Sequence, residues 1–247
     1  MTPAQQRTLI LVILAAGALA VVTATLIALT RPQRDIQIEA PAATNGPSGG
    51  FTFFDVDKST VLTRDLRRRL STTLGSDAIA HATPIDLTVV DQAFMEAQLP
   101  EVARLNRQLN PPLGERREHN TTRLTYLRAE SRNMPFRHIE LVFSNHNGRP
   151  LYFIIKPTEE FSDSIATLTS KYGPPRKVQT DERSLPVRIW EWEGDYLLAT
   201  SFRRRNGRLS QELRIYFMDN LKQLAEIETQ KLHRQDNRSQ KAGERAF

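Results

Sequence analysis

The most concentrated charge in the sequence is a run of arginines around a predicted hairpin turn. Arg203, Arg204, Arg205 and Arg208 surround Asn206-Gly207, a dipeptide that favours a tight turn between antiparallel strands. The planar guanidinium of arginine can bind carboxylate or phosphate through two parallel hydrogen bonds. The run is therefore a candidate site for phosphate, lipid headgroups or an acidic partner. Charged residues also protect strand edges from aggregation, and that structural role is the alternative.

Two tryptophans form a second candidate site, an aromatic surface. Trp190 and Trp192 lie two residues apart in a predicted strand, so their side chains share one face, and Glu191 and Glu193 share the other. Two large aromatic side chains on one face of a strand are typical of a packed core. The alternative is a surface on which a ligand or partner stacks, because tryptophan is also enriched at interfaces.

The histidines suggest no metal site. Glu115 and His119 would share a face if their segment were helical, but no further ligand pair stands at a suitable spacing. We expect His119 to lie in a solvated charged loop. His138 and Glu140 fall on the polar side of a predicted strand, where we expect them to be exposed.

Other chemical motifs are missing from the sequence. There is no cysteine, which excludes disulfides, thiolate zinc sites and cysteine nucleophiles. There is also no nucleophile elbow, no zinc-protease motif, no glycine-rich phosphate loop and no dinucleotide fingerprint. We therefore predict no catalytic residues, no cofactor and no metal, and we favour a non-enzymatic role.

The strongest pattern is an apolar run near the N-terminus. Residues 9–29 read LILVILAAGALAVVTATLIAL, without a charge. A helix of this length spans about 30 Å, the thickness of the hydrocarbon core of a bilayer. We predict a transmembrane helix that follows a short tail, residues 1–8. The alternative is a cleaved signal peptide, for which Ala18-Leu19-Ala20 has the right shape.

The charges beside this helix leave its orientation nearly balanced. Arg7 and the α-amino group precede it, and Arg31 and Arg34 follow it, with Asp35 close by. A short tail, an apolar helix and a large domain are the layout of a signal anchor. We therefore expect a single-pass protein of the cell inner membrane, with its N-terminus inside and its domain in the periplasm. Its expected partners are the bilayer, through residues 9–29, and another envelope protein.

The remaining sequence predicts one α+β domain, residues 51–233, between a flexible linker (30–50) and a disordered tail (234–247). Leucines every fourth residue from Leu62 to Leu74 predict a helix, Thr83-Pro84 resembles the start of another, and Pro100 begins a third. After Thr83-Pro84, the alternation of Ile85, Leu87 and Val89 would equally fit a strand. Residues 51–118 are thus expected to be mainly helical.

Residues 120–233 are expected to form mainly antiparallel sheet, in the order β-β-β-α-β-β-β-α. The predicted strands are 123–129, 137–144, 151–155, 187–192, 196–203 and 209–218, and the predicted helices begin near Glu159 and Asp219.

Three functions are compatible with these features. The first is a non-catalytic extracytoplasmic binding or assembly module held at the membrane. The second is an enzyme whose site is assembled from residues distant in sequence. The third is a cytoplasm-facing basic domain that binds nucleic acid or anionic lipid through Arg203 to Arg208. It ranks last because the +6 net charge is accompanied by no nucleic-acid motif.

Overall fold

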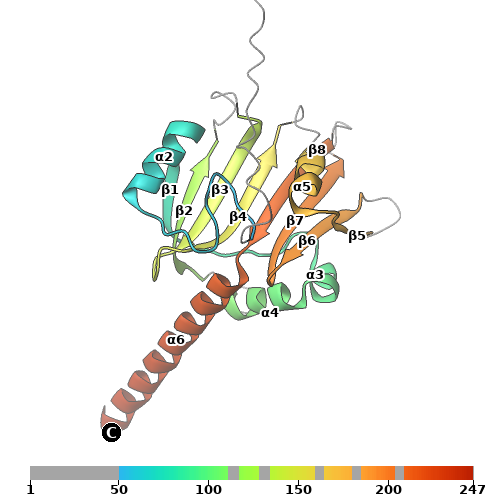
Figure 1. Ribbon diagram of the computed structural model, residues 1–247. Helices are drawn as coiled ribbons and strands as arrows, with labels where there is room; N and C mark the ends of the chain where they lie inside the picture. Colours follow the sequence, from blue (N-terminus) through green and yellow to red (C-terminus); the bar gives the residue numbers. More distant parts are fainter. Residues whose placement is uncertain are drawn as a thin grey trace, which may run out of the picture. The chain divides into compact units, whose positions relative to one another are not determined.

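Eight strands form one antiparallel sheet in the computed structural model, and helices accompany it (Figure 1), which makes the fold class α+β. The order across the sheet is β1-β2-β3-β4-β8-β7-β6-β5. The strands are β1 (Ala78–Thr83), β2 (His119–Tyr126), β3 (Phe136–Ser144), β4 (Pro150–Pro157), β5 (Arg176–Val178), β6 (Val187–Trp192), β7 (Asp195–Arg203) and β8 (Leu209–Tyr216).

The structure describes residues 50–110, 117–127, 134–158, 164–179, 185–203 and 209–246. The predicted tail 1–8, the predicted membrane helix 9–29 and all but the last residue of the predicted linker 30–50 lie outside these ranges. Within the described ranges, no helix is both long enough and apolar enough to cross a membrane.

The sheet consists of two four-stranded meanders, β1–β4 and β5–β8, joined where β4 pairs with β8. The predicted hairpin at Asn147-Gly148 is confirmed, because β3 and β4 pair antiparallel on either side of it. Gly148 has a φ of 72°, which favours glycine. Its carbonyl accepts a hydrogen bond from the N–H of Leu62 at 2.8 Å, so this turn also holds the chain that leads into the helix beginning at Arg64.

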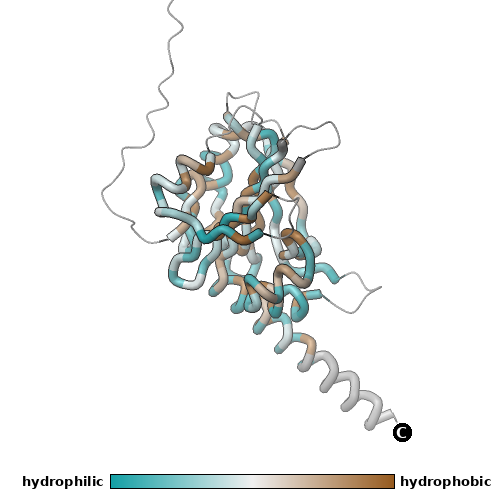
Figure 2. The backbone as a smooth tube through the Cα atoms, turned by 90° about the vertical axis from the view of Figure 1, so that its right-hand side faces the viewer, coloured by the Kyte–Doolittle hydropathy of each residue, from teal (hydrophilic) through white to brown (hydrophobic). Residues whose placement is uncertain are grey.

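One face of the sheet is covered by α2 (Arg64–Leu74), α5 (Ser164–Tyr172) and the segment that begins at Phe51. The predicted leucine face of α2 is confirmed, and Thr63 caps this helix by accepting a hydrogen bond from the N–H of Leu66. Hydrophobic residues recur along the strands and along the helix turns that cover them (Figure 2). The buried residues of this core include Phe51, Leu66, Leu70, Leu74, Leu124, Leu141, Phe153, Trp190, Leu197 and Ile215.

The opposite face packs against α3 (Gln92–Gln98), α4 (Pro100–Leu109) and the beginning of α6 (Met218–Ala246). Buried residues of this second core include Leu87, Met95, Val102, Leu105, Val142, Tyr152, Leu198, Tyr216, Leu221 and Leu224. Since both faces are covered, neighbouring residues of a central strand are buried on opposite sides. Leu141 and Val142 of β3 are an example.

An extended segment, residues 84–88, connects β1 to the second core, and we call it the strap. Side chains of the sheet donate hydrogen bonds to three of its carbonyls: Arg123 to Pro84 at 2.9 Å, Tyr216 to Leu87 at 2.8 Å and Arg214 to Thr88 at 2.7 Å. The prediction of a helix that starts at Thr83-Pro84 is therefore wrong. The alternative, a strand, agrees with the extended backbone and with the burial of Ile85 and Leu87, although this segment is not part of the sheet. The next helix, α3, starts later, where the carboxylate of Asp91 accepts from the N–H of Phe94 at 2.8 Å.

Three elements differ from the sequence-based expectation. Residues 51–118 contain the strand β1, which lacks alternation because five of its six residues are exposed. The short strand β5 was not predicted either. The tail 234–247, predicted to be disordered, is helical up to Ala246. That segment is rich in Gln, Lys, Arg, Glu and Ala and contains no proline, so α6 can continue through it.

Replacing Arg214 by Leu tests how strongly the strap depends on the sheet. Arg214 also pairs with Glu212 at 2.7 Å, and the exposed fractions of the two side chains are only 14% and 12%. Arg214→Leu leaves the Thr88 carbonyl and the Glu212 carboxylate without this donor. We expect the free energy of unfolding to fall by about 3 kcal/mol, measured by chemical denaturation. Arg69→Leu on the exposed side of α2 is the control, with a change below about 0.5 kcal/mol. Equal losses in the two variants would contradict this role.

Candidate functional site

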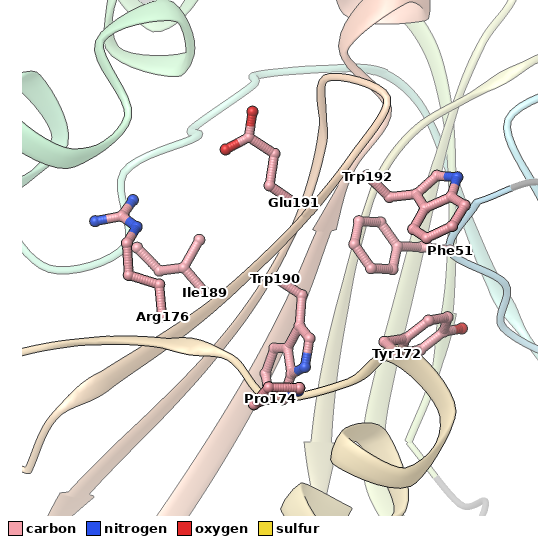
Figure 3. A pocket seen from close by; sticks show the side chains of 8 residues that line it. All are labelled: Phe51, Tyr172, Pro174, Arg176, Ile189, Trp190, Glu191 and Trp192. Atoms are coloured by element: carbon pink, nitrogen blue, oxygen red, sulfur yellow. The ribbon is translucent and has the colours of Figure 1, made fainter. Parts of the chain in front are cut away.

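A cavity of about 260 Å³ lies beside β6 and contains both predicted tryptophans in its lining (Figure 3). Its lining residues come from the segment before α2, the end of α5, β5 and β6. They are Phe51, Tyr172, Pro174, Arg176, Ile189, Trp190, Glu191 and Trp192. The structure thus brings Trp190 and Trp192 together, and adds aromatic and charged residues that sequence reasoning did not connect with them.

Two prolines explain why the cavity forms here. α5 ends at Tyr172, Gly173 follows with a φ of 81°, and Pro174-Pro175 lead into β5. Proline has no N–H to donate to a neighbouring strand. Pairing between β5 and β6 therefore extends only from Val178 and Val187 to Arg176 and Ile189. Beyond Ile189, β6 pairs with β7 alone among the described residues.

The aromatic wall is fixed by packing and by hydrogen bonds. Trp190 is 4% exposed, and its indole N–H donates to the carbonyl of Gly173 at 2.8 Å. The rings of Phe51 and Tyr172 meet edge to face at 5.1 Å. Trp192 is only partly buried. From the sequence, a place in the core and a place on a binding surface were alternatives for the tryptophans. Trp190 has both roles, because it is buried in the core and also forms part of the cavity wall.

Three charged residues, Arg176, Glu191 and Glu193, lie at or beside the cavity, and Glu191 is the carboxylate without an ion pair among the described residues. Arg176 is held by Gln98, with hydrogen bonds of 2.6 Å to its side chain and 3.3 Å to its carbonyl. Glu193 pairs with Lys58 at 2.8 Å. Glu191 is exposed, and within the described ranges no ion pair involves it. In Figure 3, Arg176 and Glu191 lie on the other side of the strand from Phe51 and Tyr172.

The predicted arginine site is described only at its first residue. Arg203 ends β7 and pairs with Leu209 at the start of β8, so the two strands form the expected hairpin. Arg204, Arg205 and Arg208 lie outside the described residues. Their predicted binding of phosphate or an acidic partner stays a prediction from the sequence.

His119 is not in a solvated loop, which corrects our expectation. It is buried in β2, with its Nδ1 2.5 Å from Oε2 of Glu228 on α6. The N–H of Asn120 donates to the other carboxylate oxygen at 3.2 Å. Burial tends to raise the pKa of Glu228, but the hydrogen bond from His119 and the nearby charges outweigh it and lower the pKa. No local pattern connects these two residues, because they lie far apart in the sequence.

A second cavity, of about 180 Å³, lies beside this pair and is lined by Arg117, Glu118, Asn120, His146, Glu228, Lys231 and Leu232. Of the pair, only Glu228 lines this cavity, and its carboxylate is already bound by His119 and by the N–H of Asn120. Within the described ranges, no group of three or more His, Asp or Glu residues could hold a metal ion. The contacts of Glu228 with His119 and Asn120 attach α6 to β2.

His138 and Glu140 also differ from the expectation, since both are half-buried. Glu140 lies 3.2 Å from Arg123 and 3.8 Å from His138. Arg123 in turn holds the strap, so these charges support the second core.

Comparison with protein-family models, curated proteins and solved structures finds no match to this chain.

Glu228→Gln tests the attachment of α6. The pKa of Glu228 is lower in the folded protein than its ordinary value of 4.5, so its carboxylate stabilises the fold above that pH. The stabilisation is lost as the pH falls below 4.5 through the folded pKa. We expect the variant to lose about 1–2 kcal/mol of unfolding free energy at pH 7. The difference from the parent protein should shrink in acid, measured by denaturation at several pH values. Glu226→Gln, at an exposed position of α6, is the control. A difference that grows in acid would contradict the assignment.

Proposed function

We propose that this protein is a membrane-tethered binding module that takes a segment of a partner protein at the cavity beside β6. Residues 9–29 anchor the chain in the inner membrane, and residues 30–50 separate the domain from the bilayer. The domain lies on the periplasmic side, where it meets another envelope protein. The cavity with its two tryptophans is the observation that supports this proposal.

The composition of the cavity favours binding over catalysis. Four of its eight lining residues are aromatic, and its other side chains are proline, isoleucine, one arginine and one glutamate. The arginine is already hydrogen-bonded to Gln98. The lining contains no serine, cysteine or histidine, and its one carboxylate, Glu191, has no second acidic residue beside it in the lining. Apolar walls with a few polar groups are typical of sites that hold a side chain of a partner.

Photo-crosslinking in intact membranes tests the binding site. With a photoreactive phenylalanine analogue in place of Glu191 in the full chain, we expect a covalent product with an envelope protein. Mass spectrometry then identifies the linked residue of the partner. The same analogue in place of Glu226, at an exposed position of α6, should give no such product.

Trp192→Ala supplies the matched variant for this experiment. Because it removes part of the aromatic wall, we expect it to lower the yield of the Glu191 product at least fivefold. A melting curve checks that the variant still folds. Equal products from positions 191 and 226, or none from position 191, would refute the proposed binding site.

The membrane topology is tested separately with a reporter enzyme fused after Phe247 that is active only when exported. We expect activity in cells, together with membrane association of the fusion that survives washing at high salt. Deleting residues 9–29 should abolish both. An inactive but stably expressed fusion would place the domain in the cytoplasm and overturn the periplasmic part of the proposal.

A further inference from the structure

The turn between β6 and β7 determines which residues of β6 direct their backbone N–H and C=O groups toward β7 and which direct them away. Glu193 and Gly194 form a two-residue turn with φ values of 48° and 84°, as in a type I′ hairpin. In such a hairpin the closing residues, Trp192 and Asp195, exchange backbone hydrogen bonds. Because hydrogen-bonded and non-hydrogen-bonded pairs alternate, Trp190 bonds to Leu197 of β7 and Glu191 does not. The N–H and C=O of Glu191 therefore point away from β7, toward the outer side of β6.

That outer side is open beside the cavity. The same alternation directs the backbone of Ile189 outward, where Arg176 of β5 pairs with it. Within the described ranges no strand continues β5 alongside Glu191, because the chain before Arg176 is Pro174-Pro175. Glu191 thus presents one backbone donor and one backbone acceptor at an open strand edge, and it lines the cavity.

The two faces of the sheet at this position have different chemistry. Directly opposed residues of antiparallel strands place their side chains on the same face, and their neighbours point to the other face. A residue opposite Glu191 would therefore lie beside the Glu191 carboxylate. The residues before and after it would lie on the face of Trp190 and Trp192.

We propose that the cavity binds an extended peptide segment that adds to the sheet beside Glu191 and carries the pattern apolar–basic–apolar. This inference rests on the proposed function and names the partner of that site. The middle residue exchanges backbone hydrogen bonds with Glu191, and its cationic side chain meets the Glu191 carboxylate. The two apolar residues pack on the aromatic wall of the cavity. Backbone pairing with alternate side-chain pockets is how strand addition combines affinity with selectivity.

The preference for a basic middle residue follows from the acidic side chain at the open edge. Arg176 keeps its positive charge because Gln98 is neutral, but two of its guanidinium nitrogens already donate hydrogen bonds to Gln98. Lys58 is paired with Glu193. Glu191 is the acidic residue beside the open edge, and its exposed carboxylate has no ion pair in the described part of the chain. A cation at the middle position neutralises it, whereas an acidic residue would be repelled.

The test uses the full chain in detergent micelles and a fluorescent peptide, acetyl-Thr-Val-Lys-Val-Thr-amide, whose binding is followed by anisotropy. Glu191→Pro removes the outward N–H without breaking a bond to β7, so the fold should persist, as checked by its melting curve. We expect this variant to bind the peptide at least tenfold more weakly. Glu191→Gln keeps the backbone donor and should lose only about threefold, with a smaller salt dependence.

Modified peptides test the pairing without altering the protein. N-methylation of the lysine backbone should abolish binding, because that N–H faces Glu191. N-methylation of the second valine, whose N–H faces away, should leave affinity within about threefold. Glutamate in place of lysine should weaken binding to the parent protein, and Glu191→Lys should reverse that preference.

The results separate this inference from the proposed function. Equal binding by Glu191→Pro, or equal effects of the two N-methylations, would overturn strand addition. If the Glu191 crosslink to an envelope protein persisted, the binding module itself would stand. A crosslink from position 191 to a second copy of this chain, without peptide binding, would overturn the peptide assignment. The absence of any crosslink would overturn the function as well.

Discussion

The hydrogen bonds from the sheet to the strap are the interaction on which the second core depends. Three carbonyls in a five-residue segment receive donors from Arg123, Tyr216 and Arg214. Burial raises the pKa of Tyr216, which therefore keeps its proton as the donor to the strap. Burial acts to lower the pKa of Arg214, but Tyr216 and Glu212 raise it above its usual value. A permanent positive charge is thus built into the sheet, and Glu212 balances it. This arrangement lets irregular backbone lie across a sheet without unpaired polar groups, and it places α3 and α4 over that face.

Features encoded within a few residues were predictable from the sequence. Asn147-Gly148 specifies its hairpin, and the spacing from Leu66 to Leu74 specifies the buried side of α2. The sequence could not decide between an extended segment and a helix for the strap, because Thr83-Pro84 is a good helix start and the donors that fix the strap lie elsewhere in the chain. β1 was missed for a different reason. Its sequence, AIAHAT, has small residues and no alternation, and its strand conformation comes from pairing with β2.

In the candidate site too, features set by neighbouring residues were predictable, and contacts between residues distant in the sequence were not. Strand parity alone predicted that Trp190 and Trp192 share a face. The cavity around them needs Phe51 from the start of the domain and Tyr172 from the end of α5, and it needs the two prolines that displace the chain from β6. Likewise, His119 looked solvated because the sequence around it is charged, whereas its partner Glu228 lies on the last helix. Pairings of this kind depend on the tertiary fold.

The long final helix has a mechanical consequence. Among the side chains described in α6, Glu228 is the last that is buried, yet the helix continues to Ala246 and leaves the sheet behind (Figure 1). At about 1.5 Å per residue, that projecting part is about 27 Å long. It acts as a lever arm whose fulcrum is the His119–Glu228 contact. A lateral pull at its C-terminal end would load the contacts at its base, which are the His119–Glu228 pair with β2 and the hydrogen bond from Gln108 of α4 to Thr229.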